Sequence, residues 1–471
     1  MAGKFEKKPS IWKRIGSALI WILLVTVLVG GIFLLVNHFM DRSGYNPEHT
    51  DPYETSAPTE TTAETTEETT IPEETTVPEE TTAATTAPTE PYVVATASIG
   101  ASGDVLPHLP VINSVKSNGQ YDFSGIFTYV KDYFNTYDYM VVNLEVPLAG
   151  ADEGYSGYPE FNSPDSIADA LKEAGVDMVL TANNHTYDQR RAGMIRTMEV
   201  LKQKGLDYTG TRTSTEESVY QVCDINGIKV GMVCYTYDTT SETSGRVSLN
   251  GIPLKNEDAE LVNSFDYTKL APFYEEFEGV LEDMREEGAE AIIAFIHWGY
   301  EYYLSPVAYQ KAMAQKLCDM GVDVIVGGHP HVLEPFDTLT SENGNTTYCL
   351  YSTGNLLSNQ RRDTLSSVEN RNYTEDGVIF GVTFQKWNDG TVEISKLDAT
   401  PTWVSKEYRG GKNVYTLIPL DTDIPDWDSY FAINDKSFLK GSYKRTMSII
   451  GEGLNEALTA LGLEPLPLTY E

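Results

Sequence analysis

Two histidines one residue apart, in the stretch Gly327-Gly328-His329-Pro330-His331, have the residue type and spacing of metal ligands. The apolar run at residues 322–326 precedes them and predicts a buried strand, so the histidines are expected at its carboxyl end, where α/β proteins place their chemistry. Because Pro330 stiffens the backbone and the glycines permit a tight turn, the two imidazoles could face two neighbouring ions. A pair of surface histidines is the alternative for this stretch alone.

Ligand-type side chains also follow three other expected strands. Residues 93–99 lead to Asp104, residues 139–142 lead to Glu145, and residues 291–296 lead to His297. Glu145 is a candidate bridge between two cations. Taken singly, a turn-forming Asp or a structural His would be ordinary at such positions. His108 is an additional candidate of lower weight.

A further expected strand, residues 176–180, ends in a stretch that contains Asn184, His185 and Asp188. The amide oxygen of Asn184 can ligate a metal while His185 faces the substrate as a proton donor. Asp188 could orient that imidazole or cap the helix expected at residues 192–205, and the sequence leaves both open.

The placement of the histidines favours one shared metal centre. Of seven histidines, all but His38 and His49 lie at or near the ends of expected strands. Since chance placement of Asp, Glu, Asn and His at five strand ends is improbable, these side chains are expected to converge. Mixed nitrogen and oxygen ligands suit Mn, Fe or Zn better than Ca.

The amino-terminal part of the chain is expected to anchor it in a membrane. Residues 1–14 are basic and form a cytoplasmic tail, and residues 15–36 are an uncharged apolar run long enough to cross a bilayer. A cleaved signal peptide is the competing interpretation, but no small-residue cleavage site follows. Residues 41–91, rich in Thr, Glu and Pro, are expected to be a disordered acidic linker that holds the remainder outside the cell.

Charge and cysteine content narrow the function classes. A formal net charge of −35 makes a nucleic-acid partner unfavourable, and an anionic partner would need metal ions or a local basic patch. The pairs Arg190-Arg191 and Arg361-Arg362 could admit a carboxylate-rich or phosphorylated substrate, or be solvated charges at helix ends.

A two-residue turn at Asn226-Gly227 would place Cys223 opposite Val230, and the four cysteines are interpreted as core residues.

From residue 92 onward, apolar strands alternate with helical stretches, which predicts an α/β domain over residues 92–405. Residues 238–268 are expected to be a looped insertion, and strands at 377–385 and 391–397 would complete the fold. Residues 406–471 are expected to be a carboxyl-terminal extension containing an amphipathic helix with a break, at 437–462, that packs on the domain or on a partner.

Six motifs, in order, resemble those of the CapA family of poly-γ-glutamate capsule biosynthesis proteins, within the calcineurin-like metallophosphoesterase superfamily. They are Gly103-Asp104, Asn143-Leu144-Glu145, Ala182-Asn183-Asn184-His185 with Asp188, His297-Trp298-Gly299 with Glu301, Gly328-His329-Pro330-His331 and Ser352-Thr353-Gly354-Asn355.

The resemblance implies a four-layer αββα sandwich with a site for two divalent metal ions. It assigns Asp104 and His331 to one ion, Asn184, His297 and His329 to the other, Glu145 to both, and His185 to proton donation. In the superfamily a histidine usually stands two residues after the first Asp. Here that residue is Leu106, so either His108 substitutes or the first ion is less fully held.

The resemblance also implies a role at the cell surface. We expect a membrane-anchored, metal-dependent hydrolase or transferase acting on poly-γ-glutamate or a related envelope polymer, with a capsule synthetase complex as a possible partner. A non-catalytic polymer-binding component of such a complex is the main alternative, and a phosphodiester hydrolase is a third.

Overall fold

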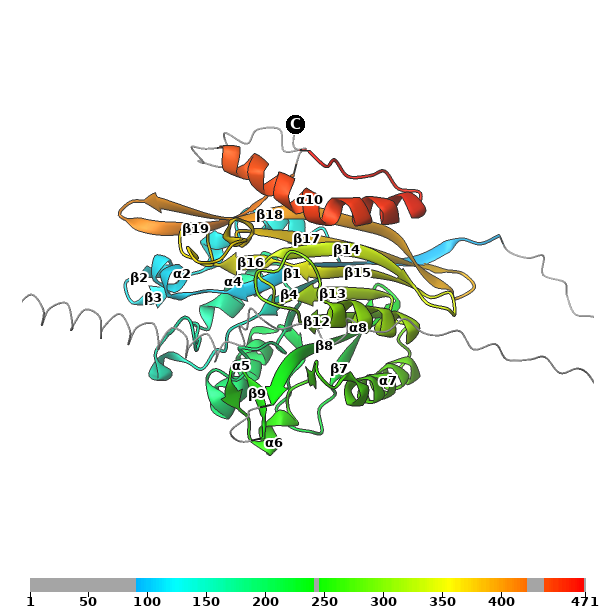
Figure 1. Ribbon diagram of the computed structural model, residues 1–471, viewed down its shortest axis with the longest axis horizontal. Coiled ribbons are helices and arrows are strands. Elements are labelled where there is room, and N and C mark those ends of the chain that lie inside the picture. Colours follow the sequence, from blue (N-terminus) through cyan, green and yellow to red (C-terminus); the bar gives the residue numbers. More distant parts are fainter. Residues whose placement is uncertain (1–89, 241–244, 422–435, 470–471) are drawn as a thin grey trace, which may run out of the picture.

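Two β-sheets form the framework of the chain in the computed structural model, which describes residues 90–240, 245–421 and 436–469 (Figure 1). The membrane helix predicted at residues 15–36 and the linker predicted at 41–91 lie outside the described residues. Among the helices within them, none combines the length and the apolar character that a bilayer-spanning segment requires.

The first sheet has the strand order β19-β18-β17-β1-β4-β5-β6, with β16 also paired to β1. Its strands are β1 (Val93–Leu106), β4 (Tyr139–Leu144), β5 (Met178–Leu180), β6 (Asp207–Thr209), β16 (Asn355–Ser358), β17 (Asp376–Trp387), β18 (Val392–Arg409) and β19 (Lys412–Pro419). The strands β1, β4, β5 and β6 run parallel, so their carboxyl ends share one edge.

The first strand is longer than the predicted segment 93–99. It continues past Asp104 because β4 and β16 both pair with it there, with a register shift beside that residue. Asp104 therefore lies within the strand at a bulge, and not in a loop after it. Bulges of this kind redirect side chains next to functional sites.

The second sheet has the order β10-β9-β8-β12-β13-β15-β14, with β7 and β11 paired to β8. Its strands are β7 (Tyr220–Ile225), β8 (Ile228–Thr240), β9 (Val247–Leu249), β10 (Ile252–Pro253), β11 (Ser264–Asp266), β12 (Ala291–His297), β13 (Val324–Gly328), β14 (Leu333–Thr340) and β15 (Thr346–Thr353). Cys223 stands opposite Val230 in the β7–β8 hairpin, as the turn at Asn226-Gly227 predicts. A separate two-stranded hairpin pairs β2 (Lys116–Ser117) with β3 (Gln120–Tyr121).

The expectation of a looped insertion at 238–268 is wrong for about half of its length. This part of the chain contains the end of β8, the β9–β10 hairpin, the short helix α6 (Asn256–Ala259) and β11. Leu249, Leu254 and Leu261 of the insertion bury themselves against Met194 and Met198, which gives the segment a small core of its own.

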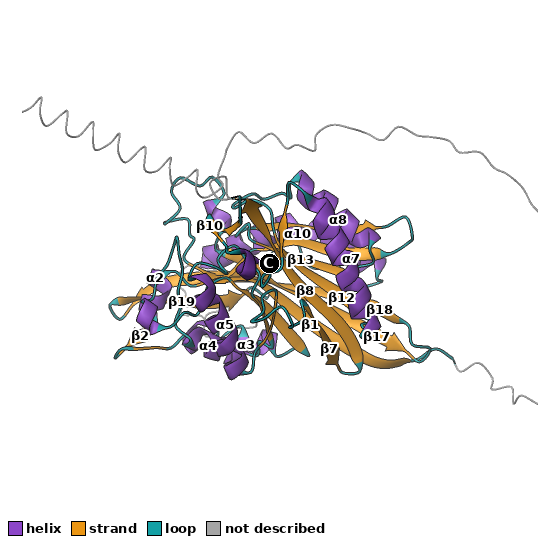
Figure 2. Ribbon diagram, turned by 90° about the horizontal axis from the view of Figure 1, so that it is seen from below, coloured by secondary structure: helices purple, strands orange, loops and turns teal. Residues whose placement is uncertain are grey.

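Helices cover the outer faces of both sheets (Figure 2). The largest core lies between the sheets and joins, for example, Ile99 and Val141 of the first to Met232 and Phe295 of the second. The helices α2 (Leu109–Ser114), α3 (Lys131–Phe134), α4 (Ser166–Ala174) and α5 (Arg190–Lys204) pack on the first sheet, and α7 (Leu270–Glu286) and α8 (Ala308–Asp319) pack on the second. This mixed α/β arrangement is compatible with the predicted sandwich.

The carboxyl-terminal region belongs to the same body. The strand β18 runs across the division predicted at residue 405, and β19 extends the first sheet further. The helix α10 (Lys436–Ala460) is continuous, without the predicted break, and lies over β14, β17 and β18 (Figure 1). Its apolar side, including Leu439, Met447 and Leu454, joins the core between the sheets. The helix therefore packs on the domain itself, which is one of the two alternatives that the sequence left open.

Candidate metal centre

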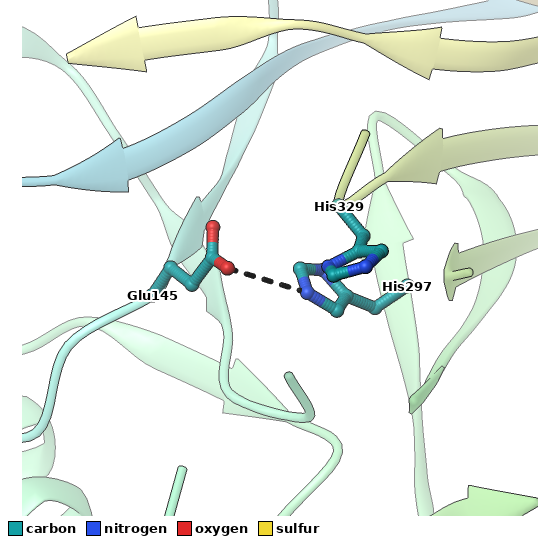
Figure 3. Close-up of side chains that lie close together, drawn as sticks. All are labelled: Glu145, His297 and His329. Atoms are coloured by element: carbon teal, nitrogen blue, oxygen red, sulfur yellow. Dashed lines mark ion pairs between the residues drawn. The ribbon is translucent and has the colours of Figure 1, made fainter. Parts of the chain in front are cut away.

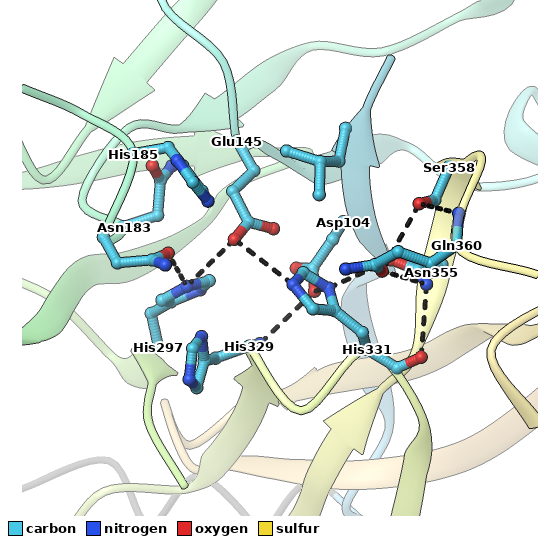
Figure 4. A network of polar contacts seen from close by, with 12 residues as sticks. Asp104, Glu145, Asn183, His185, His297, His329, His331, Asn355, Ser358 and Gln360 are labelled. Atoms are coloured by element: carbon cyan, nitrogen blue, oxygen red, sulfur yellow. Dashed lines mark hydrogen bonds and ion pairs between the residues drawn. The ribbon is translucent and has the colours of Figure 1, made fainter. Parts of the chain in front are cut away.

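Carboxyl ends of parallel strands from both sheets meet at one buried cluster (Figure 4). The first sheet supplies Asp104 from β1, Glu145 just after β4 and Asn184 from the loop after β5, and the second supplies His297 at the end of β12 and His329 and His331 after β13. All six side chains belong to buried residues. The side chains that the sequence placed at separate strand ends therefore lie together.

Glu145 is shared by two groups of potential ligands. The ligand atoms of Glu145, His297 and His329 lie within 4.8 Å of one another (Figure 3). Those of Asp104, Glu145 and His331 also lie within 4.8 Å of one another (Figure 4). The Asn184 amide oxygen lies 2.9 Å from His297 Nε2, which places it in the first group. This division has the same members as the one that the family resemblance implies.

The cluster contains buried polar atoms that have no hydrogen-bond partner among the described residues. Both carboxylate oxygens of Glu145, Nδ1 of His329 and Nε2 of His331 are buried and form no hydrogen bond there. Buried unpaired polar groups are costly, and all four atoms belong to side chains of the two ligand groups. Their donor types fit divalent cations of the Mn, Fe and Zn class.

The hydrogen bonds of His331 fix which ring nitrogen is free. Its Nδ1 lies 3.1 Å from both Asp104 Oδ2 and Asn355 Oδ1. Because both neighbours are acceptors, the ring proton belongs on Nδ1, and the lone pair of Nε2 points toward Glu145 Oε1 at 3.8 Å. That is the tautomer in which a histidine can ligate a metal through Nε2.

Electrostatics reinforce this interpretation for Glu145, His297 and His329, whereas for His331 the hydrogen bond and charge of Asp104 outweigh burial and raise the pKa above its usual value. Burial, together with the charges of Asp104 and Glu301, raises the pKa of Glu145 well above its usual value. Burial lowers the pKa of His297 to about 3 and that of His329 well below its usual value. Neutral imidazoles beside a carboxyl that resists ionisation are the condition that bound cations would relieve.

The backbone of the histidine stretch is strained. His329 and His331 have φ of 96° and 57°, in the left-handed region that β-branched and bulky residues avoid. A side chain on Gly327 would overlap the carbonyl of Tyr351, and one on Gly328 would lie 3.0 Å from Asp104 Oδ1. Close packing therefore excludes a side chain at Gly327, whereas one at Gly328 would require the carboxylate of Asp104 to shift.

His185 and Asp188 form a buried pair at the margin of the cluster. His185 Nδ1 lies 2.8 Å from Asp188 Oδ2, and the two side chains are 4% and 0% exposed. Of the two roles open for Asp188, its contacts fit the orienting one, because its carboxylate accepts from His185, the Phe161 amide and Asn250. The ring of Phe161 packs edge-on against His185, with centroids 4.8 Å apart.

His108 does not join either ligand group. Its Nδ1 lies 3.0 Å from the carbonyl oxygen of Leu106, and its ring packs on Phe161. Burial lowers the pKa of His108 to about 4. Leu106, at the position where the superfamily usually has a histidine, is itself buried. The ion held by Asp104 and His331 would therefore have fewer protein ligands than its neighbour.

The four arginines considered for substrate binding are all ion-paired. Arg361 and Arg362 both contact Glu375, at 3.2 and 2.6 Å, and the side chain of Arg361 is only 8% exposed. Arg191 lies 2.5 Å from Asp258, and Arg190 lies 3.2 Å from Glu160 with half of its side chain exposed. Structural roles account for all but Arg190.

Several amide side chains around the cluster carry roles that the sequence did not reveal. Asn143 Nδ2 donates to Asp104 Oδ1 at 2.7 Å, and Asn183 Nδ2 donates to Asn143 Oδ1 at 3.1 Å. Asn355 Nδ2 donates to the carbonyl of His331 at 3.1 Å. These three lie in quoted motifs, so their position was a usable signal. Asn250 lies in the insertion and contacts Asp188 of the His185–Asp188 pair, and no sequence motif indicated this role.

Residues 98–360 match the family described as "Bacterial capsule synthesis protein PGA_cap", which is more than half of the chain. The chain belongs to this capsule synthesis family. It is 28% identical over 254 residues to "Capsule biosynthesis protein CapA" of Bacillus anthracis, covering 51% of this chain and 55% of that protein. It is 26% identical over 306 residues to "PGA biosynthesis protein CapA" of Bacillus subtilis strain 168, covering 63% and 72%.

The CapA family assignment confirms the resemblance seen in the six motifs, all of which lie inside the matched residues. Among solved structures, TT1561 of Thermus thermophilus aligns with a TM-score of 0.31 and 7% identity, over 60% of this chain and 93% of that one. That likeness is too slight to bear on the fold or the function of the capsule synthesis protein.

Proposed function

We propose that this capsule synthesis protein is a metal-dependent hydrolase or transferase that acts on poly-γ-glutamate or a related anionic envelope polymer. The observation that carries the proposal is Glu145, whose two buried oxygens lack hydrogen-bond partners in the described part of the chain and lie between two sets of ligand side chains. A carboxylate in that position is suited to bridging two cations.

Two divalent ions would be held by the two groups that share Glu145. Asp104 and His331 would serve one, and Asn184, His297 and His329 would serve the other. When bound, such ions supply Lewis acidity, activation of water at neutral pH and neutralisation of an anionic transition state. They would also provide the positive charge that a carboxylate-rich polymer needs near an acidic protein.

His185 would move the proton. With one ring proton on Nδ1 directed at Asp188, Nε2 is the nitrogen that can take up a second proton from water and deliver it to a leaving group, which returns the ring to its neutral form. Figure 4 draws the His185 ring on the Glu145 side of the cluster, beside the groups that would hold the ions. A site that only binds polymer has no need of a buried His–Asp pair, which favours catalysis.

A non-catalytic polymer-binding role in a capsule synthesis complex is the second candidate. It is favoured by Leu106, which leaves the Asp104 and His331 ion with few protein ligands. In either role, the basic residues 1–14 and the apolar residues 15–36 would anchor the protein in the cell membrane, with residues 92–471 outside the cell.

The test compares native protein with His185→Gln, using purified full-length protein, poly-γ-glutamate and a generic phosphodiester. Metal content is measured on each sample, and His49→Gln serves as the matched histidine control. Catalysis predicts that His185→Gln loses turnover of polyglutamate while keeping its metal. Polymer binding without turnover by the native protein would contradict catalysis and support the second candidate, whereas turnover of the phosphodiester alone would redirect the substrate assignment.

A further inference from the structure

The tip of the β9–β10 hairpin reaches into the neighbourhood of His185. The hairpin turns at Asn250-Gly251, where both residues have positive φ, 49° and 68°. Asn and Gly are the residues that such two-residue turns require. The hairpin is held in place by the insertion core that contains Leu249 and Leu254, so its tip has a fixed position.

The side-chain amide of Asn250 makes two hydrogen bonds at this tip. Its Nδ2 donates to Asp188 Oδ1 at 2.9 Å and to the carbonyl oxygen of Pro159 at 2.7 Å. An amide nitrogen has two hydrogens, so both are used. The distance of 3.4 Å between Asn250 Nδ2 and His185 Nδ1 is therefore a contact between two donors and not a third bond.

Asn250 completes the set of donors around a fully buried carboxylate. Asp188 Oδ2 accepts from the Phe161 amide at 2.7 Å and from His185 Nδ1 at 2.8 Å, which leaves only Oδ1 for Asn250. Three donors from three separate segments define the plane of the carboxylate. With Oδ2 fixed in front of Nδ1, the ring proton of His185 stays on Nδ1.

We propose that Asn250 is a positioning residue, which acts through Asp188 to fix the tautomer and orientation of His185. The catalytic consequence rests on the proposed function, whereas the effect on the His185 ring does not. The insertion that carries Asn250 thereby serves the site through Asp188.

Two substitutions distinguish the role of the Asn250 side-chain amide from the role of the turn's backbone conformation. Asn250→Gly keeps the left-handed backbone and removes both hydrogen bonds, and Asn250→Asp keeps the shape but places a second carboxylate against Asp188. Asn118→Gly is the matched control, because Asn118-Gly119 forms an equivalent turn with φ of 51° and 84° between β2 and β3. Thermal unfolding shows whether each variant is folded.

The readouts are ¹⁵N NMR of labelled histidine ring nitrogens and steady-state kinetics on poly-γ-glutamate. We expect a single Nδ1-protonated form of His185 in native protein and a mixture of ring forms in both Asn250 variants. We also expect kcat to fall roughly tenfold or more, with KM little changed.

Unchanged ring signals in Asn250→Gly would overturn the proposal, and so would equal effects in Asn118→Gly. If native protein shows no turnover, the proposed function fails, but the NMR comparison still decides the role of Asn250.

Discussion

Glu145 Oε1 lies 3.4 Å from His297 Nε2, and these two residues belong to different sheets. The first sheet provides Asp104 from within β1, and Glu145 and Asn184 from just after β4 and β5. The second sheet provides His297 as the last residue of β12, and His329 and His331 from just after β13. Neither sheet has a complete set of ligands. The candidate metal centre therefore lies at the interface between the two sheets, and any ion bound there would contact side chains from both.

Metal binding is accordingly expected to stabilise the fold. An ion at a hundred times its Kd should raise the free energy of unfolding by about 2.7 kcal/mol relative to chelator-treated protein. Thermal or urea unfolding with and without Mn²⁺ or Zn²⁺ measures the gain, and Asp104→Asn should reduce it. If none of the metals tested changes the unfolding midpoint, the claim that a bound ion links the two sheets is contradicted.

The stability of metal-free protein should fall in mild acid, partly through His108. Burial lowers the folded pKa of His108 to about 4 from an ordinary 6.5. The unfolded chain therefore binds the proton more readily, so stability is fully present above pH 6.5 and is lost as the pH falls toward 4. For one such group the loss between pH 7.5 and 5 is about 2 kcal/mol.

Urea unfolding of native protein and His108→Gln at both pH values isolates this contribution. The variant should show a shallower dependence on pH by about that amount. Identical pH dependence in the two proteins would show that His108 titrates as freely when folded as when unfolded.

Glu334 should make the folded protein less stable as the pH rises, which is the opposite of the pH dependence expected from His108. It is buried, its Oε2 accepts from Gln310 at 2.8 Å, and burial raises its pKa to about 8. Its contribution is fully present below pH 4.5 and is lost as the pH rises through 8. Glu334→Gln should therefore gain on the order of 3 kcal/mol relative to native protein between pH 5 and 8, measured by urea unfolding. A constant difference between the two proteins would contradict the shifted pKa.

Two glycines of α10 should respond differently to the same substitution. A Cβ on Gly453 would lie 1.8 Å from the Phe336 carbonyl oxygen of β14, whereas one on Gly441 would meet only the flexible end of Arg445 at 3.3 Å. Gly453→Ala should destabilise by about 2 kcal/mol or more, because the helix must shift off the sheet. Gly441→Ala should stabilise by roughly 0.5–1 kcal/mol. Equal effects in thermal unfolding would mean that α10 does not pack closely on β14.

Local sequence was sufficient to place the ligand candidates. An apolar run that ends in Glu145 or His297 predicts a buried strand with a polar side chain at its carboxyl end, and parallel strands bring such ends to one edge. The prediction placed Asp104 in the cluster correctly but in the wrong element, since only the pairing of β1 with β4 and β16 reveals the longer strand.

Contacts between distant segments could not be predicted in the same way. Asn250 reads as an ordinary turn residue, and its bond to Asp188 spans 62 positions. Arg361 and Arg362 were candidates for substrate binding because no local sequence signal predicts that the buried Glu375 pairs with both. Such pairings depend on the assembled sheets and not on local periodicity.

The most direct test of the central claim is the metal content of native protein and Glu145→Ala, measured by elemental analysis after loading with Mn²⁺, Fe²⁺ or Zn²⁺ and removal of free ions. Glu334→Ala is the matched control, because it also removes a buried glutamate but outside the cluster. The shared position of Glu145 predicts close to two ions per native chain and per control chain, and fewer than one in Glu145→Ala. Metal content that is negligible in native protein, or equal in all three, would contradict it.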